Sequence, residues 1–574
     1  MTICHMWQKA REARDANDPK TEELFRLLGD ICSLHLRLES PEQPFGPMMT
    51  SQQGRTAIPE DFDDDQVKFL NDVVRDVTDA DLRARIGDVL WFLRRDYKIG
   101  EVAVSAYLES AVALEDPERW VATYDRIARA LQLATLLGRN AQSYQLVVRH
   151  IEDVLARCNG EDPLFLSARM MGLLQDCRTG DSARYAALSE KLALKGERER
   201  DWDRARTYWE TKAQWHRIAK EEVEQRAAKV RAAETYVQQS EAHLSGNPPS
   251  YSLASTFLQK AIEAFRRVGD SEHRIQELHS KLLEYQKKSV SELRHFSHDI
   301  DITDTVAKAI ESVKDKSVLD AMLSLATIVK PLNNESLRSQ AEENRKRYVL
   351  QNLFTKIYVN AFGRVIARHP IDDDEALRAD MCSLATQFQS MHVQAIIEPA
   401  RRQVVSDHSV RVGDFAVMLS DHRLIPAGRE MIVARGLHAG LNGDFVVSTH
   451  LLVPQLEESV RYLLAQTGVI ASSLDDTGVQ EEIDLNRTLC SSKFAKPLAE
   501  ILGTDIVFEM RTLLVERFGA NLRNDMAHGL VDHDSFYSPS TRYLWWLALH
   551  LYSFPVLARL KAAHEQRANE SSVE

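Results

Sequence analysis

Apolar residues recur three and four positions apart along most of this chain, the spacing that puts them on one face of a helix. Between residues 66 and 290 such stretches follow one another, rich in Ala and Leu and separated by single Gly or Pro residues. Helical hairpins stacked side by side produce this pattern. We therefore expect an all-α protein with an α-solenoid-like region over residues 66–290. An irregular helical array is the alternative.

Two stretches of this region share a local pattern. Ala130 stands eight residues before Gly138, and Ala261 stands eight residues before Gly269. A small residue lets a neighbouring helix approach closely, and glycine commonly ends a helix. The similarity to tetratricopeptide-type repeats is loose, because the sequence keeps no 34-residue period. The pattern favours stacked hairpins without assigning a repeat family.

The remainder of the chain divides into four further segments. Residues 1–65 predict one helix at 22–38 followed by a loop and an acidic linker, and this segment is expected to be peripheral. Residues 291–404 predict a helical connector, residues 405–565 a helical bundle, and residues 566–574 a flexible tail. The apolar segment at 543–558 is shorter than the roughly 20 residues of a membrane span, and it contains His550 and Pro555. We expect it to be a buried core helix, with no membrane as partner.

Composition narrows the class of protein. The 574 residues include only 23 Gly and 17 Pro, which agrees with long helices. The net charge of −13 excludes a basic coat that attracts polyanions over the whole surface, so any nucleic-acid contact is expected to be local. The six cysteines form no closely spaced pair, and the N-terminus has no apolar signal segment. These features predict a cytoplasmic protein.

One histidine and aspartate cluster resembles a metal site at first sight: His295, His298, Asp299, Asp301 and Asp304. It lacks the Glu that a zinc-protease helix places between two His residues. The acidic residues are also typical of a loop followed by a capped helix. We predict neither a metal nor another cofactor.

The segment most informative about chemistry is residues 518–534, FGANLRNDMAHGLVDHD. A short helix is predicted to begin near Asn521 and to carry Arg523, Asn524 and His528. Five helical steps leave Arg523 and His528 about 140° apart, so a shared target needs arginine's reach, a distorted helix end or a partner chain. Asn524 and His528 are one turn apart, so the amide is expected to orient the imidazole. Asp532 is expected to approach from the next turn.

These residue types suit RNA cleavage without a metal. Histidine can take a proton from a ribose 2′-hydroxyl near neutral pH, or return one to a leaving 5′-oxygen. Arginine holds phosphate with bidentate, charge-assisted hydrogen bonds. As a bare pattern, Arg523 and His528 favour hydrogen bonding at a helix end over catalysis, because Arg and His five residues apart occur by chance in many helices.

The sequence N-L-R-N-D-M-A-H-G-L resembles the signature of the HEPN superfamily (higher eukaryotes and prokaryotes nucleotide-binding domains): Arg, four to six residues, then His, often with Asn after the Arg. Residues 406–560, including IPAGREMIVARGLHAGLNGD, resemble a HEPN-like bacterial family of unknown function related to the endoplasmic-reticulum-membrane-associated RNA degradation protein. The resemblance implies a four- or five-helix bundle that dimerises, so that two Arg and His motifs line one cleft. It also implies metal-independent endoribonuclease activity.

Under this resemblance, Arg523 binds the scissile phosphate, His528 acts as general acid or base, and Asn524 supports them. A second helix would supply supporting polar groups at intervals of seven and four residues: His450, Glu457 and Arg461. The spacing favours a surface ion pair between Glu457 and Arg461. The alternative is that Glu457 or Glu458 reaches into the cleft and orients Arg523 or His528.

The sequence therefore predicts a HEPN-type endoribonuclease that leaves 2′,3′-cyclic phosphate ends. Its expected biological role is that of a toxin or an antiphage or stress effector. RNA is the expected substrate, a homodimer forms through the C-terminal bundle, and the N-terminal helices bind a trigger or protein partner. The alternative is a non-catalytic dimeric scaffold or a nucleotide- or RNA-binding protein, in which Arg523 and His528 serve structure alone.

Overall fold

The computed structural model describes residues 3–571 except 52–53, 117, 294–298, 349–355, 361–362, 369–373, 421 and 475–479. Helices dominate, and the strands form short antiparallel two-stranded hairpins. This confirms the prediction of an all-α protein. The chain divides into two compact units, Met1–Glu292 and Leu293–Glu574.

Unit 1 begins with two helices and two small hairpins, and it continues as a row of helices. Its helices are α1 (Ile3–Asp15), α2 (Pro19–Cys32), α3 (Asp64–Val73), α4 (Ala80–Arg94), α5 (Tyr97–Ala113), α6 (Val121–Leu137), α7 (Gln142–Cys158), α8 (Leu166–Asp176), α9 (Ser182–Glu199), α10 (Trp202–Ala219), α11 (Glu222–Leu244), α12 (Tyr251–Val268) and α13 (Glu272–Ser289). Its strands are β1 (Leu34–Leu36), β2 (Phe45–Pro47), β3 (Thr50–Ser51) and β4 (Gly54–Arg55).

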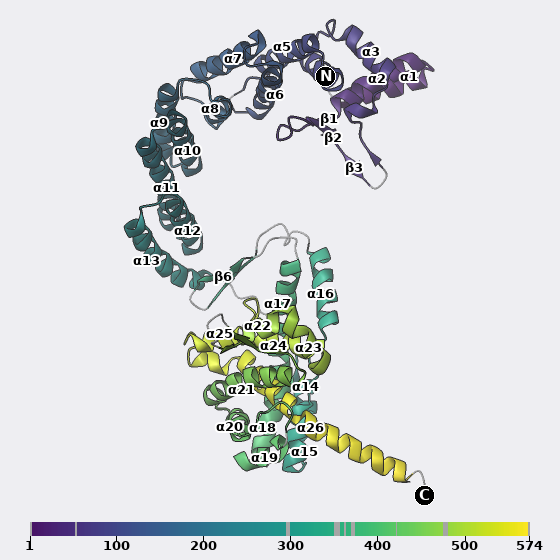
Figure 1. Cartoon of the computed structure of the whole chain (residues 1–574), viewed down its shortest axis with the longest axis vertical. Helices are drawn as coiled ribbons and strands as arrows, with labels where there is room; N and C mark the ends of the chain where they lie inside the picture. Colours follow the sequence, from purple (N-terminus) through teal and green to yellow (C-terminus); the bar gives the residue numbers. More distant parts are fainter. Residues whose placement is uncertain are drawn as a thin grey trace. The chain divides into compact units, whose positions relative to one another are not determined.

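Helices α4 to α7 pack each on the next, α8 packs on α7 and α10, and α9 to α13 again pack each on the next. Figure 1 shows the helices from α5 to α13 as a row. Ala130 and Ala261 are fully buried between helices. Gly138 and Gly269 each follow the last residue of a helix with positive φ, at 125° and 79°. The local pattern therefore predicted both the buried positions and the helix ends.

The N-terminal segment differs from its prediction. The predicted helix at 22–38 ends at Cys32, because Leu34–Leu36 pairs with Phe45–Pro47 as an antiparallel hairpin. A second helix, α1, precedes it. The segment is also not peripheral, since Leu27 and Ile31 are buried in one cluster with Ile86 of α4.

A fully buried ion pair joins three helices of unit 1. Arg129 of α6 donates from Nε and Nη2 to the two carboxylate oxygens of Asp88 on α4, at 2.8 and 2.9 Å. The Tyr107 hydroxyl of α5 donates to the same carboxylate at 2.9 Å. Both charged side chains are 0% exposed. The charges are therefore satisfied entirely within the protein.

Unit 2 is a helical bundle with two hairpins. Its helices are α14 (Thr303–Val313), α15 (Val318–Ala326), α16 (Asn334–Arg347), α17 (Asp374–His392), α18 (Glu398–Asp407), α19 (Val412–Leu419), α20 (Glu430–Leu441), α21 (Phe445–Gln466), α22 (Leu485–Cys490), α23 (Ser492–Leu502), α24 (Thr504–Leu514), α25 (Leu522–Ala527) and α26 (Pro539–Ser571). A π-helical turn, Val393–Ile397, joins α17 to α18. The strands are β5 (Ile357–Val359), β6 (Val365–Arg368), β7 (Ser472–Leu474) and β8 (Gln480–Glu482).

The apolar segment of α26 forms the centre of unit 2. Trp545 donates from its indole to the carbonyl of Leu437 on α20, at 2.9 Å. Trp546 donates to the carbonyl of Leu325 at the end of α15, at 3.1 Å. This confirms the prediction of a buried core helix. Within the described ranges, no helix combines the length and the apolar character that a membrane crossing requires.

The segment predicted as a connector belongs to this same core. Val393 and Val404, from the predicted connector, are buried in one cluster with Leu437 and Leu452 of the predicted bundle. The predicted boundary at residue 405 therefore separates helices that share a hydrophobic core.

Candidate functional site

The loop between α24 and α25 positions the Arg and His motif. A Cβ atom on Gly519 would lie 2.1 Å from the carbonyl oxygen of Thr512, so this close turn requires glycine. The next residue, Ala520, donates its backbone N–H to the same oxygen at 3.0 Å. Asn521 then adopts φ 49°, and α25 begins at Leu522. The turn thus sets where the six-residue helix starts.

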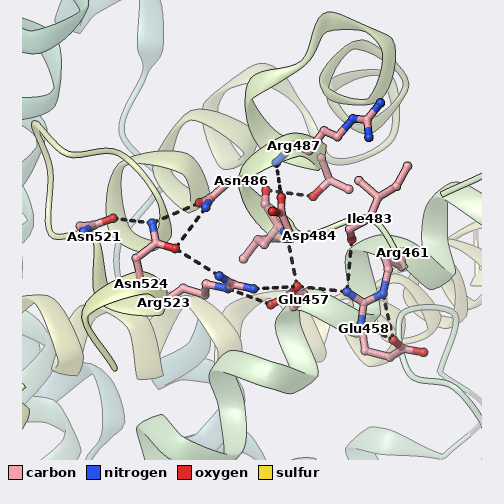
Figure 2. A network of polar contacts seen from close by, with 12 residues as sticks. Glu457, Glu458, Arg461, Ile483, Asp484, Asn486, Arg487, Asn521, Arg523 and Asn524 are labelled. Atoms are coloured by element: carbon pink, nitrogen blue, oxygen red, sulfur yellow. Dashed lines mark hydrogen bonds and ion pairs between the residues drawn. The ribbon is translucent and has the colours of Figure 1, made fainter. Parts of the chain in front are cut away.

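Arg523 is held by two acceptors from different parts of unit 2 (Figure 2). Its Nε and Nη2 donate to the two carboxylate oxygens of Glu457 on α21, at 3.2 and 3.4 Å. Its Nη1 donates to the side-chain oxygen of Asn524, at 3.2 Å. The Arg523 side chain is 25% exposed and that of Glu457 is 14% exposed. The guanidinium is therefore oriented but still reaches solvent.

Glu457 also makes the ion pair with Arg461 that the helical spacing favours, at a partly buried position. Its Oε1 accepts from Nη1 of Arg461 at 3.1 Å and from the backbone N–H of Leu485 at 3.2 Å. Arg461 in turn donates to Glu458, at 2.7 Å through Nη2. The carboxylate of Glu457 thus binds both Arg523 and Arg461.

Asn524 supports Arg523 but does not orient His528 as predicted. Its amide nitrogen donates to Asn521 at 2.7 Å and to Asn486 of α22 at 3.2 Å. The Asn486 amide donates back to the Asn524 oxygen at 3.1 Å. The Asn524 side chain thus bonds to Asn521, Asn486 and Arg523, and among the described residues it has no hydrogen bond to the His528 ring. The expectation of an amide-oriented His528 is wrong.

His528 lies just past the end of α25 and is exposed. Its backbone N–H donates to the Asn524 carbonyl at 3.0 Å, and Gly529 follows with φ 64°. No hydrogen bond of its ring is found among the described residues. Burial raises the pKa of Asp525, while the bond from Asn521 and the charge of His528 act in the opposite direction. The imidazole is accessible, with a carboxyl group nearby.

Two residues predicted to support the site have other roles. Asp532 accepts the backbone N–H of Ser535 at 2.8 Å and so caps the short 3-10 helix Asp534–Tyr537. The bonds from Ser535 lower the pKa of Asp532. The His450 ring bonds to the Val446 carbonyl at 2.8 Å and lies 5.1 Å from the ring of Phe536. Neither residue contacts Arg523 or His528 in the described part of the chain, so both predictions are corrected.

The histidines that resembled a metal site, His295 and His298, lie outside the described residues. Asp301 accepts the backbone N–H of Thr303, the first residue of α14, at 3.0 Å, but the N-cap position itself is Ile302, which has no side-chain capping bond. Within the described residues, no group of three His, Cys, Asp or Glu side chains is placed to hold a metal ion.

Sequence reasoning missed Asn486. It lies in α22, whose start is capped by Asp484, and it reaches Asn524 only because α22 packs near α25. An Asn in a short helix carries no periodicity or motif that would single it out. The reciprocal amide pair is therefore a product of tertiary packing.

Comparison with known proteins bears on unit 1 alone. Residues 4–145 match the model of a family described as a domain of unknown function (DUF7380). The match runs from α1 into the first turn of α7. No curated protein matches the chain.

Proposed function

We propose that unit 2 is a metal-independent endoribonuclease of the HEPN type. The observation that carries the proposal is an oriented, partly exposed Arg523 in a short helix that ends at the exposed His528. Glu457 and Asn524 restrict the guanidinium, so less freedom is lost when it binds a phosphate. The resemblance of residues 521–530 to the HEPN signature supplies the reaction class.

The chemistry follows from these two side chains. A neutral His528 takes the proton from a ribose 2′-hydroxyl, and the 2′-oxygen attacks the adjacent phosphorus. The bond from phosphorus to the 5′-oxygen breaks, and that oxygen takes up a proton from an acid group or water. Arg523 stabilises the charge that develops on the phosphate oxygens. The products are a 2′,3′-cyclic phosphate end and a 5′-hydroxyl end.

The biological setting belongs to the same proposal. Two copies of unit 2 dimerise and bring two motifs to one cleft, and the helical row of unit 1 binds the trigger or protein partner. The protein acts in the cytoplasm as a toxin or as an antiphage or stress effector. The six cysteines are all free thiols, which is compatible with a reducing compartment.

One observation favours a second function, a non-catalytic dimeric scaffold. All three guanidinium nitrogens of Arg523 are bonded within the chain, as in a purely structural pair. In that case the site would bind RNA weakly or not at all, and His528 would be a solvent-exposed helix end.

Cleavage of RNA by the purified full chain in EDTA tests the proposal. Wild type should cut and leave cyclic phosphate ends, and His528→Ala should cut about 10²–10⁴-fold more slowly because the proton-transfer group is gone. His533→Ala is the matched control, since His533 is also exposed and lies five residues away. An equal loss of cleavage in both variants, or no cleavage by wild type, would support the second function, a non-catalytic scaffold.

A further inference from the structure

A groove of unit 1 combines unused hydrogen-bonding groups with an exposed apolar side chain. It has a volume of about 490 Å³ and lies where α5 and α7 pack against each other. We call it the α5–α7 groove. Its α5 wall consists of Glu101, Val104, Ser105 and Leu108. Its α7 wall consists of Gln142, Ser143, Leu146, Arg149, His150 and Asp153.

Each wall of the groove is one face of one helix. The wall residues follow one another at intervals of one, three and four positions, which places them along the same side of α5 or α7. From Gln142 to Asp153 the α7 wall extends about 16–17 Å, at about 1.5 Å per residue. An extended chain of about five residues covers that length. The lining therefore suits a linear ligand.

Two polar atoms buried in the α7 wall have no partner. Ser143 is 7% exposed, and its Oγ has no hydrogen bond among the described residues. The same is true of Nε2 of His150, seven residues or about two turns further along α7. A buried polar atom without a hydrogen bond destabilises the folded state, and most such atoms in proteins are paired. A ligand that bonds to Ser143 and His150 would remove this cost.

The charges of the groove do not balance. Within the described part of the chain, the side chains of Glu101, Arg149 and Asp153 form no ion pair or hydrogen bond. Burial lowers the pKa of His150, and the charge of Arg157 acts in the same direction. The imidazole is therefore mainly neutral at pH 7. Two carboxylates accompany one guanidinium, which favours a ligand with a basic group over a strand of phosphates.

Leu146 supplies an apolar contact in the middle of the α7 wall. Its side chain is 46% exposed, and it stands one turn after Gln142 and one turn before His150. On the α5 wall, Val104 is buried in the core of unit 1 and Leu108 packs on that core. An apolar side chain of a ligand that covers Leu146 would remove apolar surface from water. The groove thus offers an apolar contact between two polar ends.

We infer that the α5–α7 groove binds an extended peptide segment of a protein partner, one that carries a basic and an apolar side chain. An extended peptide leaves backbone N–H and C=O groups unpaired, and Ser143 and His150 can bond to them. The basic side chain pairs with Glu101 or Asp153, and the apolar side chain covers Leu146. The inference rests on the part of the proposed function that gives unit 1 a protein partner. It does not require that unit 2 cleaves RNA.

A displayed library of random octapeptides, selected on the immobilised full-length protein, supplies the probe. Peptides with Arg or Lys close to Leu, Ile or Val should be enriched, and the affinity of one synthetic, fluorescent copy is then measured by anisotropy. Leu146→Ala and the double variant Glu101→Gln, Asp153→Asn should each weaken its binding about tenfold, through loss of apolar and charge-assisted contacts. Ser143→Ala should weaken binding about threefold or more. It should not lower the thermal stability of the free protein, because the hydroxyl that it removes has no partner there.

Two controls match these variants. Leu136→Ala changes a leucine that is 51% exposed on α6, and Asp72→Asn with Asp76→Asn removes two exposed carboxylates at and after the end of α3. None of these residues lines the groove, so both controls should bind like wild type. Unchanged affinity in the groove variants, or an equal loss in the controls, would overturn the inference.

The selection itself can also contradict the inference. If no sequence is enriched on wild type, the groove is not a peptide site. If the enriched peptides carry no basic residue, the assignment of a basic side chain is wrong. Either failure would leave the ribonuclease proposal in place wherever wild type cleaves RNA. Groove-dependent peptide binding without any cleavage would keep the inference and remove the ribonuclease.

Discussion

Arg129 in unit 1 and Arg523 in unit 2 make the same kind of bond in opposite surroundings. Each donates from Nε and Nη2 to both oxygens of a carboxylate, Asp88 in one case and Glu457 in the other. The Arg129 pair is 0% exposed, whereas the Arg523 side chain is 25% exposed. The bonds of Arg129 are also shorter, at 2.8 and 2.9 Å against 3.2 and 3.4 Å.

The difference separates a structural ion pair from one that a ligand can use. A buried cation cannot exchange its carboxylate for a phosphate, and losing its partner leaves an uncompensated charge. A partly exposed cation with longer bonds reaches solvent, and the surrounding water weakens its pairing. The surroundings of each pair, rather than its bonding pattern, thus decide which arginine is available for chemistry.

The largest effect on stability is expected from Arg129→Met. The substitution leaves Asp88 buried without its cation, which should lower the free energy of unfolding by about 3–5 kcal/mol. Urea unfolding of the full chain, monitored by circular dichroism, measures this loss of unfolding free energy. The double variant Arg129→Met, Asp88→Leu should regain much of the loss, because no buried charge remains. A loss below about 1 kcal/mol for the single variant would contradict this account.

A buried carboxyl group without a cation offers the next test. Glu509 accepts from the Tyr543 hydroxyl at 2.7 Å and from the Leu332 N–H at 3.2 Å, while its other oxygen is buried and has no hydrogen bond within the geometric limits among the described residues. Burial raises the pKa of Glu509 to about 7, from 4.5 in an unfolded chain, and the charge of Asp505 acts in the same direction. The folded state therefore favours the protonated acid.

The sign of the pH dependence follows from this raised pKa. The protonated Glu509 side chain makes its full contribution to stability below about pH 4.5, and this contribution is lost as the pH rises through about 7. The free energy of unfolding should therefore fall by about 3 kcal/mol over this pH range. Thermal unfolding between pH 4.5 and 8 measures it, with Glu509→Gln as the variant that lacks this dependence. The same slope in both proteins would show that other groups cause it.

A smaller effect on stability is expected from Glu457→Gln. The variant weakens the bonds to Arg523 and Arg461 at a partly buried site, at a cost of about 1–2 kcal/mol. Cleavage should fall by more than this loss of folded protein explains, because Arg523 is no longer oriented. Glu458→Gln is the control, since Glu458 contacts Arg461 but makes no bond to Arg523. Equal losses of cleavage in the two variants would argue against an orienting role.

The smallest effect on stability is expected from His528→Ala. The ring is exposed, so the change in unfolding free energy should stay within about 0.5 kcal/mol. His550→Ala provides the contrast, because that ring is buried and bonds to the Ala326 carbonyl at 2.7 Å. Differential scanning calorimetry compares the two. If His528→Ala lowered the free energy of unfolding as much as His550→Ala does, His528 would have a structural role.

Much of the helical framework could be predicted from the sequence. The apolar periodicity of residues 504–518 predicts a single helix, whereas α24 begins at Thr504 and ends at Leu514. The chain turns there, and the N–H of Ala520 bonds back to the carbonyl of Thr512, which a periodic pattern does not indicate. The prediction was therefore accurate where local periodicity decides and inaccurate where a tertiary turn intervenes.

The candidate site was predictable only in part. The contact between Arg523 and Glu457 spans 66 residues, and the sequence offered it only as the alternative to the pair between Glu457 and Arg461, which are one helical turn apart. The pairing of Asn524 with Asn486 spans 38 residues and was not expected at all. Helical spacing predicts that Asn524 and His528 share one face. In the structure, Asn524 pairs with the amide of Asn486 instead of the imidazole of His528.

By itself, the sequence determined the all-α class, the glycine helix ends at Gly138 and Gly269, and the buried segment of α26. These properties depend on neighbours within a few residues, through helical periodicity and backbone conformation. Only the tertiary structure decided that the predicted connector shares the core of unit 2, and which acceptors orient Arg523. Those outcomes depend on how distant helices pack, because the free energy of burying their apolar faces is shared among segments far apart in the chain.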